Sequence, residues 1–250
     1  MIVMDDVGVT LGRSTIIKNL CLSIQSGEMT LFIGPALQGI LSAVCGQIPL
    51  DAGRIEVDGF PVNSDAARQK MVCVFEKPLM NPYLTPRKNL SYYLKLRGVK
   101  STSADLDSYA KGLLLHEFVD SKVSILGHGI VRGFETLEAL IAKPKYYILC
   151  DFTASFFVTY IKRIPGELAS LLQSGTGILS STPSLELARA LSNHLPIRVV
   201  VLSKEGVLAD GPIDEILNQL PETTLMTLEP PREQPKSFEI AKAIEALKIE

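Results

Sequence analysis

Two glycines, Gly34 and Gly39, have the spacing of a phosphate-binding loop. Such a loop reads G-x-x-x-x-G-K-[ST]: its backbone N–H groups surround the phosphates, its lysine neutralises their charge and its hydroxyl side chain holds Mg²⁺. In an alignment without gaps, Ile40 stands at the lysine position, Leu41 at the hydroxyl position, and Ser42 follows. We therefore expect this stretch to lack the side chains that hold a nucleoside triphosphate.

A single carboxylate, Asp151, directly follows the apolar run 146–150. Metal-assisted hydrolysis of a phosphoanhydride uses two adjacent carboxylates at such a place, one for Mg²⁺ and one to polarise the attacking water. The neighbours of Asp151 are Cys150 and Phe152, which cannot take the second role. Since one carboxylate cannot fill both roles, we do not expect efficient hydrolysis.

The four cysteines are Cys21, Cys45, Cys73 and Cys150, far apart in the chain and each within an apolar run. No CxxC pair and no histidine-rich tract accompanies them, so the sequence predicts no metal site. We expect four buried, reduced thiols.

The composition excludes several functional classes. The chain has 250 residues, 46% of them hydrophobic, with 25 basic and 27 acidic residues and a net charge of −2. This balance gives no general attraction to nucleic acid, so no nucleic-acid partner is expected. No run approaches 18 uncharged apolar residues, and the first ten residues carry Asp5 and Asp6 without a basic region. We therefore expect neither a membrane-spanning helix nor a signal peptide.

Apolar runs alternate with helical patterns along most of the chain. The runs 29–33, 71–75, 146–150, 177–181 and 197–203 predict buried strands, and the alternation predicts a mainly parallel α/β sheet. Thr85 and Pro86 predict the start of a helix, and residues 101–145 are helical in pattern with a glycine-rich interruption at 125–133. Residues 1–27 are typical of further strands.

The C-terminal part of the chain changes character. Residues 217–236 are rich in proline, glutamate and threonine and predict a linker. In residues 237–250, Phe238, Ala241, Ile244 and Leu247 share one helical face, which predicts a helix that docks on the domain.

The order of these segments resembles the nucleotide-binding domain of ATP-binding-cassette (ABC) transporters, over roughly residues 1–216. The landmarks that carry the resemblance are Gly27-Glu28 before the strand ending at Gly34-Pro35; Asp51-Ala52-Gly53-Arg54-Ile55 with Asp58-Gly59; Leu84-Thr85-Pro86-Arg87-Lys88-Asn89-Leu90; Arg97-Gly98; Val123-Ser124-Ile125-Leu126-Gly127; Ala142-Lys143-Pro144-Lys145; Thr153-Ala154-Ser155; and Lys204-Glu205-Gly206 through Asp210-Gly211. It implies a P-loop NTPase-like α/β cassette with a mainly parallel core sheet, an N-terminal antiparallel β subdomain and a helical subdomain at about 85–140.

The resemblance also implies which positions carry chemistry in the family. The run from Gly34 to Gly53 is about three residues shorter than the family pattern, so the phosphate loop is either substituted or partly deleted, and both alignments remove its lysine. Thr153-Ala154-Ser155 aligns Cys150 with the magnesium aspartate and Asp151 with the catalytic glutamate. A shift of one residue makes Asp151 the magnesium ligand instead and leaves Phe152 as the base.

Further family positions are occupied by residues that lack the expected group. The adenine-stacking aromatic corresponds to Leu11, the glutamine that senses magnesium to Glu76, the D-loop aspartate to Phe157 and the switch histidine to Pro183. The signature LSGGQ, which holds the γ-phosphate bound to the opposite subunit, corresponds to residues 125–129. There, Leu126 replaces the serine, Gly127 is retained and His128 adds a side chain where the phosphate approaches.

From these substitutions we expect a pseudo-ATPase cassette without ATP or metal as cofactor, a scaffold or regulator of transport. The alternative is a divergent ATPase that uses ATP and Mg²⁺ through rebuilt contacts, from His128 or from Lys111, Lys122 and Arg132. A third hypothesis is a cassette-derived binding protein without a membrane partner.

The resemblance implies two partners, a polytopic membrane permease and a second cassette subunit, identical or different. It implies a cytoplasmic position at the inner face of the membrane. The loop at 76–85 is expected to receive a helix of the permease, and its candidate contact residues are Glu76, Met80, Tyr83 and Leu84.

Overall fold

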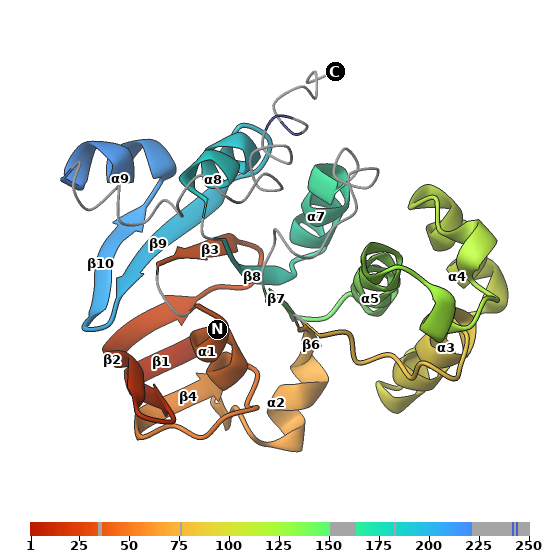
Figure 1. Ribbon diagram of the computed structural model, residues 1–250, viewed down its shortest axis with the longest axis horizontal. Helices are drawn as coiled ribbons and strands as arrows, with labels where there is room; N and C mark the ends of the chain where they lie inside the picture. The colour runs from red at the N-terminus through yellow and green to blue at the C-terminus, as the bar shows by residue number, and fades with distance from the viewer. Residues whose placement is uncertain are drawn as a thin grey trace.

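The N-terminal part of the chain forms a small antiparallel sheet. The computed structural model describes residues 1–34, 37–75, 77–150, 164–182 and 184–221, together with residues 242 and 244. The strand order of this sheet is β2-β1-β4-β5, and every pairing is antiparallel (Figure 1). Its strands are β1 (Ile2–Leu11), β2 (Ser14–Ile24), β4 (Ala52–Val57) and β5 (Phe60–Pro61).

A six-stranded sheet forms the centre of the molecule, in the order β10-β9-β3-β8-β7-β6. Its strands are β3 (Met29–Ile33), β6 (Met71–Val74), β7 (Tyr146–Leu149), β8 (Gly177–Ser181), β9 (Ile197–Ser203) and β10 (Gly206–Gly211). All pairings from β9 to β6 are parallel, and β10 joins the edge antiparallel to β9. The mainly parallel α/β architecture predicted from the alternating runs is confirmed.

Helices cover both faces of this core sheet. The short helix α1 (Leu37–Val44) lies on the face towards the N-terminal sheet, and α2 (Asp65–Lys70) precedes β6. Three helices gather beyond β6 at one edge (Figure 1): α3 (Pro86–Leu96), α4 (Ser103–Gly112) and α5 (His128–Ala142). Short 3-10 turns lie at His116–Phe118 and Val123–Ile125. The opposite face is covered by α7 (Ile164–Gln173), α8 (Leu185–Ser192) and α9 (Ile213–Gln219).

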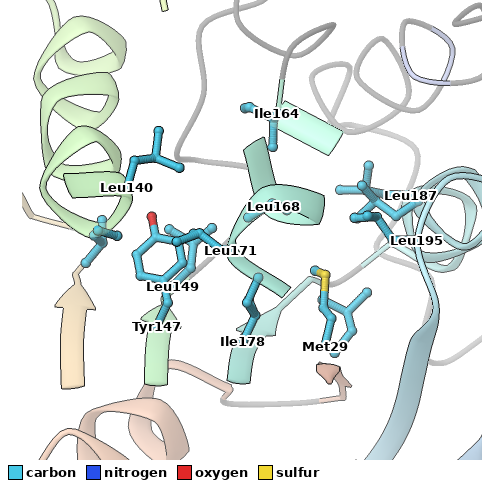
Figure 2. Close-up of a cluster of buried hydrophobic side chains, with 14 of the residues drawn as sticks. Met29, Leu140, Tyr147, Leu149, Ile164, Leu168, Leu171, Ile178, Leu187 and Leu195 are labelled. Carbon is cyan, nitrogen blue, oxygen red and sulfur yellow. The ribbon is translucent and has the colours of Figure 1, made fainter. Parts of the chain in front are cut away.

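The two faces of the core sheet contribute to two hydrophobic clusters, because successive side chains of a strand point to opposite faces. In β7, Tyr146 and Ile148 pack in the cluster that includes α1 and the N-terminal sheet. Tyr147 and Leu149 pack on the other side, against the α5 and α7 layer (Figure 2). The core sheet is therefore buried on both faces, as its continuous apolar runs predict.

The predicted start of the helix at Thr85 and Pro86 is confirmed in detail. Thr85 caps α3, since its side chain accepts a hydrogen bond from the Lys88 N–H, and Pro86 is the first helical residue. Asp58 and Gly59 have φ of 51° and 79°, and they join β4 to β5 in a tight hairpin.

The predicted glycine-rich interruption of the helical region lies elsewhere than expected. Gly127 is the N-cap of α5, but Gly129 and Gly133 lie within the helix. A Cβ on Gly133 would stand 3.0 Å from Cδ1 of Leu115, so this glycine allows Leu115 to pack closely on the helix. Tertiary packing here outweighs the low helix propensity of glycine.

Of the C-terminal face predicted to dock, the described residues include Ile244. It is fully buried in the larger cluster, and its carbonyl lies 3.0 Å from Nε2 of His194. Phe238, Ala241 and Leu247 lie outside the described residues. Within the described part of the chain, no helix combines the length and the apolar character that crossing a bilayer requires.

Candidate functional site

The connection between β3 and α1 is short. β3 ends at Ile33 and α1 is helical from Leu37, so at most three residues separate them. The phosphate-loop motif needs four residues between its glycines, followed by the lysine. Gly39 lies in the first turn of α1. Pro35 lies outside the described residues.

Both glycines have structural roles in this region. Gly34 has a φ of +149°, and a Cβ on it would stand 2.3 Å from the carbonyl oxygen of Leu202 in β9. A Cβ on Gly39 would stand 3.1 Å from Cγ2 of Ile16 and 3.3 Å from Cδ1 of Leu11. Leu11, at the position of the adenine-stacking aromatic, therefore lies against the first turn of α1.

The side chains at the lysine and hydroxyl positions of the gapless alignment lie in the core. Ile40 is 2% exposed and Leu41 is fully buried, both in the cluster between the two sheets. Ser42 is half-buried. The described part of this segment presents no cation to a phosphate.

The signature positions lie at the N-terminus of α5. Gly127 and His128 are exposed, Leu126 is half-buried, and no side chain caps the helix at Gly127. The preceding turn is fixed to the loop after β6, since the N–H groups of Val123 and Ser124 donate to the carbonyls of Leu84 (3.0 Å) and Pro82 (2.9 Å).

The cations proposed for rebuilt contacts are not equivalent. Lys111 and Lys122 are exposed, whereas Arg132 is fully buried, with Nη1 3.3 Å from Oε2 of Glu135. Arg132 is thus part of the interior and is removed from the candidates for nucleotide contact.

Cys150, at the position of the magnesium aspartate, directly follows β7. It is buried, and its N–H donates to the Val74 carbonyl at 2.8 Å. The other candidate catalytic positions, Asp151, Glu76 and Pro183, lie outside the described residues, as do Phe152 and Phe157. Cys150 carries a thiol, so the described end of β7 has no carboxylate.

The loop after β6 exposes a different set of residues from those selected in the sequence. Tyr83 is 81% exposed and Leu84 is half-buried, but Met80 is 5% exposed and belongs to the core. Leu79, which the sequence analysis did not select, is 57% exposed. We call residues 77–85 the docking loop.

Two glutamates in the middle of α5 line a pocket of about 240 Å³ beside the docking loop. Burial raises the pKa of Glu135 to about 7, although a hydrogen bond from the Leu79 N–H and the charge of Arg132 oppose this shift. Burial also raises the pKa of Glu138, against the opposing effect of Arg97, whose Nε donates to Oε1 at 2.9 Å. The sequence signal for this pocket was available: two carboxylates spaced i, i+3 within an apolar helical stretch.

Comparison with known proteins agrees with this fold. Residues 17–154, more than half of the chain, match the family described as ABC transporter. A curated relative, the spermidine/putrescine import ATP-binding protein PotA of Pasteurella multocida (strain Pm70), is 26% identical over 245 residues. That alignment covers 95% of this chain and 61% of the relative, so the chain spans about three fifths of the relative's length.

Solved structures share the architecture. A structure described as the ATP binding subunit of an ABC transporter has a TM-score of 0.76 at 18% identity. The alignment covers 98% of this chain and 99% of the chain in that structure. The dimeric structure of MJ0796, a bacterial ABC transporter cassette, has a TM-score of 0.72 at 20% identity, with coverages of 85% and 99%. With its antiparallel N-terminal sheet, its mainly parallel core sheet and its family match, the chain belongs to the ABC transporter family as an ATP-binding cassette domain.

Proposed function

We propose that this chain is a cassette subunit that docks on a membrane permease or on an active cassette partner and acts there as scaffold or regulator, without efficient ATP hydrolysis. One observation carries the proposal: the connection from β3 to α1, of at most three residues, is too short for the phosphate-loop motif. The burial of Ile40 and Leu41 supports it, since neither side chain is exposed at the surface where a phosphate would bind.

The missing contacts are expected to weaken ATP binding substantially. A hydrogen bond to a charged group contributes about 1.5–3 kcal/mol. Without the lysine, the hydroxyl and several loop N–H groups, about 5 kcal/mol or more is missing. This corresponds to roughly 10³–10⁴ in affinity, which moves a micromolar ATP site into the millimolar range. Loss of a general base removes a further ~10²–10⁴ in rate.

A second candidate function is favoured by the comparisons. The curated relative and the structure of highest TM-score reported above are both named as ATP-binding. On that basis the chain is a divergent subunit that binds and hydrolyses ATP with Mg²⁺. The exposed N-terminus of α5 at His128, with Lys111 and Lys122 exposed nearby in sequence, is the described region in which such contacts would lie.

The two functions differ in a thermal melt with and without millimolar Mg-ATP. A ligand at about 100 times its Kd adds about 2.7 kcal/mol of stability, and each kcal/mol raises the Tm by roughly 2–4 °C at this chain length. The pseudo-ATPase proposal expects no shift beyond that given by ATP without magnesium. A magnesium-dependent rise of several degrees would support the divergent ATPase instead.

The proposed partners follow from the cassette family. MJ0796 is described as a dimer, which supports a second cassette subunit as a partner of this chain. The exposed apolar side chains of the docking loop, Leu79 and Tyr83, support contact with a permease. This role places the protein in the cytoplasm, at the inner face of the membrane.

A further inference from the structure

Three of the four cysteines converge on one side of the core sheet. Cys45 follows the last residue of α1, Cys73 lies in β6, and Cys150 follows β7. All three belong to, or pack against, the hydrophobic cluster between the two sheets. The thiols of Cys150 and Cys73 lie close enough to Cys45 to raise its pKa. Cys45 and Cys73 also line the same pocket, so these two side chains meet at one cavity.

These thiols differ in their exposure to solvent. Cys45 and Cys73 are half-buried and line the pocket of about 240 Å³, whereas Cys150 is buried. The fourth cysteine, Cys21 in β2, is exposed and belongs to the other sheet, which corrects the expectation of four buried thiols. A small reagent that enters the pocket thus reaches Cys45 and Cys73.

The surroundings of Cys45 lower its reactivity at neutral pH. Burial raises the pKa of the Cys45 thiol well above its usual value, and the neighbouring thiols of Cys150 and Cys73 raise it further. The nucleophile in thiol–disulfide exchange is the thiolate, and a thiol with a raised pKa holds little of it at neutral pH. Cys45 is therefore a poor first nucleophile toward a disulfide in solution. It is better suited to attack a mixed disulfide that has already formed on a neighbouring cysteine.

We propose that Cys73 and Cys45 are a reactive thiol pair that exchanges with a low-molecular-weight disulfide, R–S–S–R. The Cys73 thiolate attacks one sulfur of the reagent, forms the mixed disulfide Cys73–S–S–R and releases RS⁻, which takes up the proton that Cys73 lost. Sγ of Cys45 then attacks Sγ of Cys73 and expels the second RS⁻, which takes up the proton of Cys45. Two protein thiols are oxidised, and one R–S–S–R is reduced to two RSH.

The resulting bond would join the end of α1 to edge strand β6 on a wall of the pocket. Leu79 of the docking loop lines the same pocket, so oxidation changes the surface next to the loop. This pair does not depend on whether the chain binds ATP. It remains testable if the pseudo-ATPase proposal fails.

The test uses the full chain carrying Cys21→Ser, incubated with oxidised glutathione and analysed by intact mass and non-reducing peptide mapping. We expect the loss of two hydrogens without an adduct, and a cross-link between the peptides of Cys45 and Cys73. Adding Cys45→Ser stops the reaction at one glutathionyl group on Cys73. Adding Cys73→Ser slows the reaction about tenfold or more, because the remaining accessible thiol is poorly ionised. Cys150→Ser is the matched control and leaves the cross-link intact.

Three outcomes would overturn the proposal: glutathionyl groups on both pocket thiols without a cross-link, a cross-link that contains Cys150, or no reaction of the folded chain. Thermal melts of the reduced variants show whether each one is folded. If a serine variant is not folded, Cys45→Ala or Cys73→Ala takes its place, because alanine adds no buried hydroxyl.

Discussion

The backbone N–H of Leu79 donates a hydrogen bond to Oε1 of Glu135 at 2.9 Å, and this bond ties the exposed docking loop to the buried middle of α5. The carbonyl of the same residue accepts from the Tyr93 hydroxyl of α3 at 3.0 Å. Both backbone groups of Leu79 are thus held by the helical layer. The loop is thereby attached to α5, which begins at His128 after the N-cap Gly127.

Glu135 gives this link a dependence on pH. Its pKa of about 7 in the folded protein lies above the value of about 4.3 in an unfolded chain. Between these values the folded state keeps a proton that the unfolded state has lost, so stability falls as the pH rises through this window. Across this window Glu135 changes the free energy of unfolding by about 2–4 kcal/mol. Glu135→Gln is expected to remove this pH dependence, because the amide does not titrate.

Urea unfolding at a series of pH values between about 5 and 8 measures this slope. The exposed Glu117→Gln is a matched control that keeps the wild-type slope. Equal slopes for Glu135→Gln and the wild type would show that the carboxyl titrates as in the unfolded chain.

Asp58 behaves in the opposite sense. Partial burial favours its neutral form, but hydrogen bonds from Lys145, the N-terminal ammonium, Tyr146 and Lys70 lower its pKa well below the usual range. Its oxygens lie 2.8 Å from Lys145 Nζ and 3.0 Å from the Tyr146 hydroxyl. The stability it supplies is present above a pH of about 4 and is lost as the pH falls through the folded-state pKa.

Asp58→Asn keeps the side-chain shape and removes the charge that joins the β4–β5 turn to the start of β7. We expect it to lower stability at neutral pH by about 1–3 kcal/mol, measured by urea unfolding. Asp65→Asn is the control, because its ion pair with Arg68 on α2 is more exposed. A variant as stable as the wild type would mean that the three cations are satisfied by solvent.

Gly34 tests whether the glycine after β3 has a structural role. Gly34→Ala would place its Cβ 2.3 Å from the Leu202 carbonyl oxygen, at a φ that L residues rarely adopt. We expect a loss of about 3 kcal/mol or more, visible as a lower Tm in the absence of any nucleotide.

Gly112→Ala in α4 is the control, because nothing lies within 4 Å of the added carbon and no positive φ is involved. It should leave the Tm unchanged or raise it. A Gly34→Ala variant with wild-type Tm would return this glycine to the candidates for phosphate contact.

The sequence predicted the sheet well, for physical reasons. Apolar runs such as 146–150 identify buried strands because both faces of a parallel sheet are covered. The Gly34–Gly39 spacing matched a loop, but a spacing does not indicate where a helix begins, and α1 already includes Gly39.

Long-range packing explains the remaining differences. Met80 looked like a surface residue because it lies in a polar, proline-rich loop, yet the core reaches it. Cys45, Cys73 and Cys150 are far apart in sequence, and only the parallel pairing of β6 with β7 and the position of α1 bring them together. Pairings of this kind leave no local pattern in the chain.

Ile40→Lys distinguishes a core position from a phosphate-facing one. An ammonium group at this 2% exposed site would lie among apolar side chains without a partner. We expect a loss of at least about 3 kcal/mol in urea unfolding and no gain in ATP binding.

Ile40→Leu, which conserves volume, should lower stability by less than about 1.5 kcal/mol. A magnesium-dependent rise in Tm with ATP in the Ile40→Lys variant would place residue 40 next to the phosphates and contradict the pseudo-ATPase proposal.

The docking loop provides the last prediction. Leu79→Ala removes an exposed apolar side chain that makes no contribution to the core, so the Tm should change little. Co-purification of a membrane permease with the chain should fall at least about fivefold, which corresponds to ~1 kcal/mol of binding free energy. Leu208→Ala is the matched control, since Leu208 is similarly exposed on β10, at the opposite edge of the core sheet. Equal recovery of a permease by both variants would exclude Leu79 from the contact. Failure of the wild type to recover any polytopic membrane protein would favour a cassette-derived binding protein without a membrane partner.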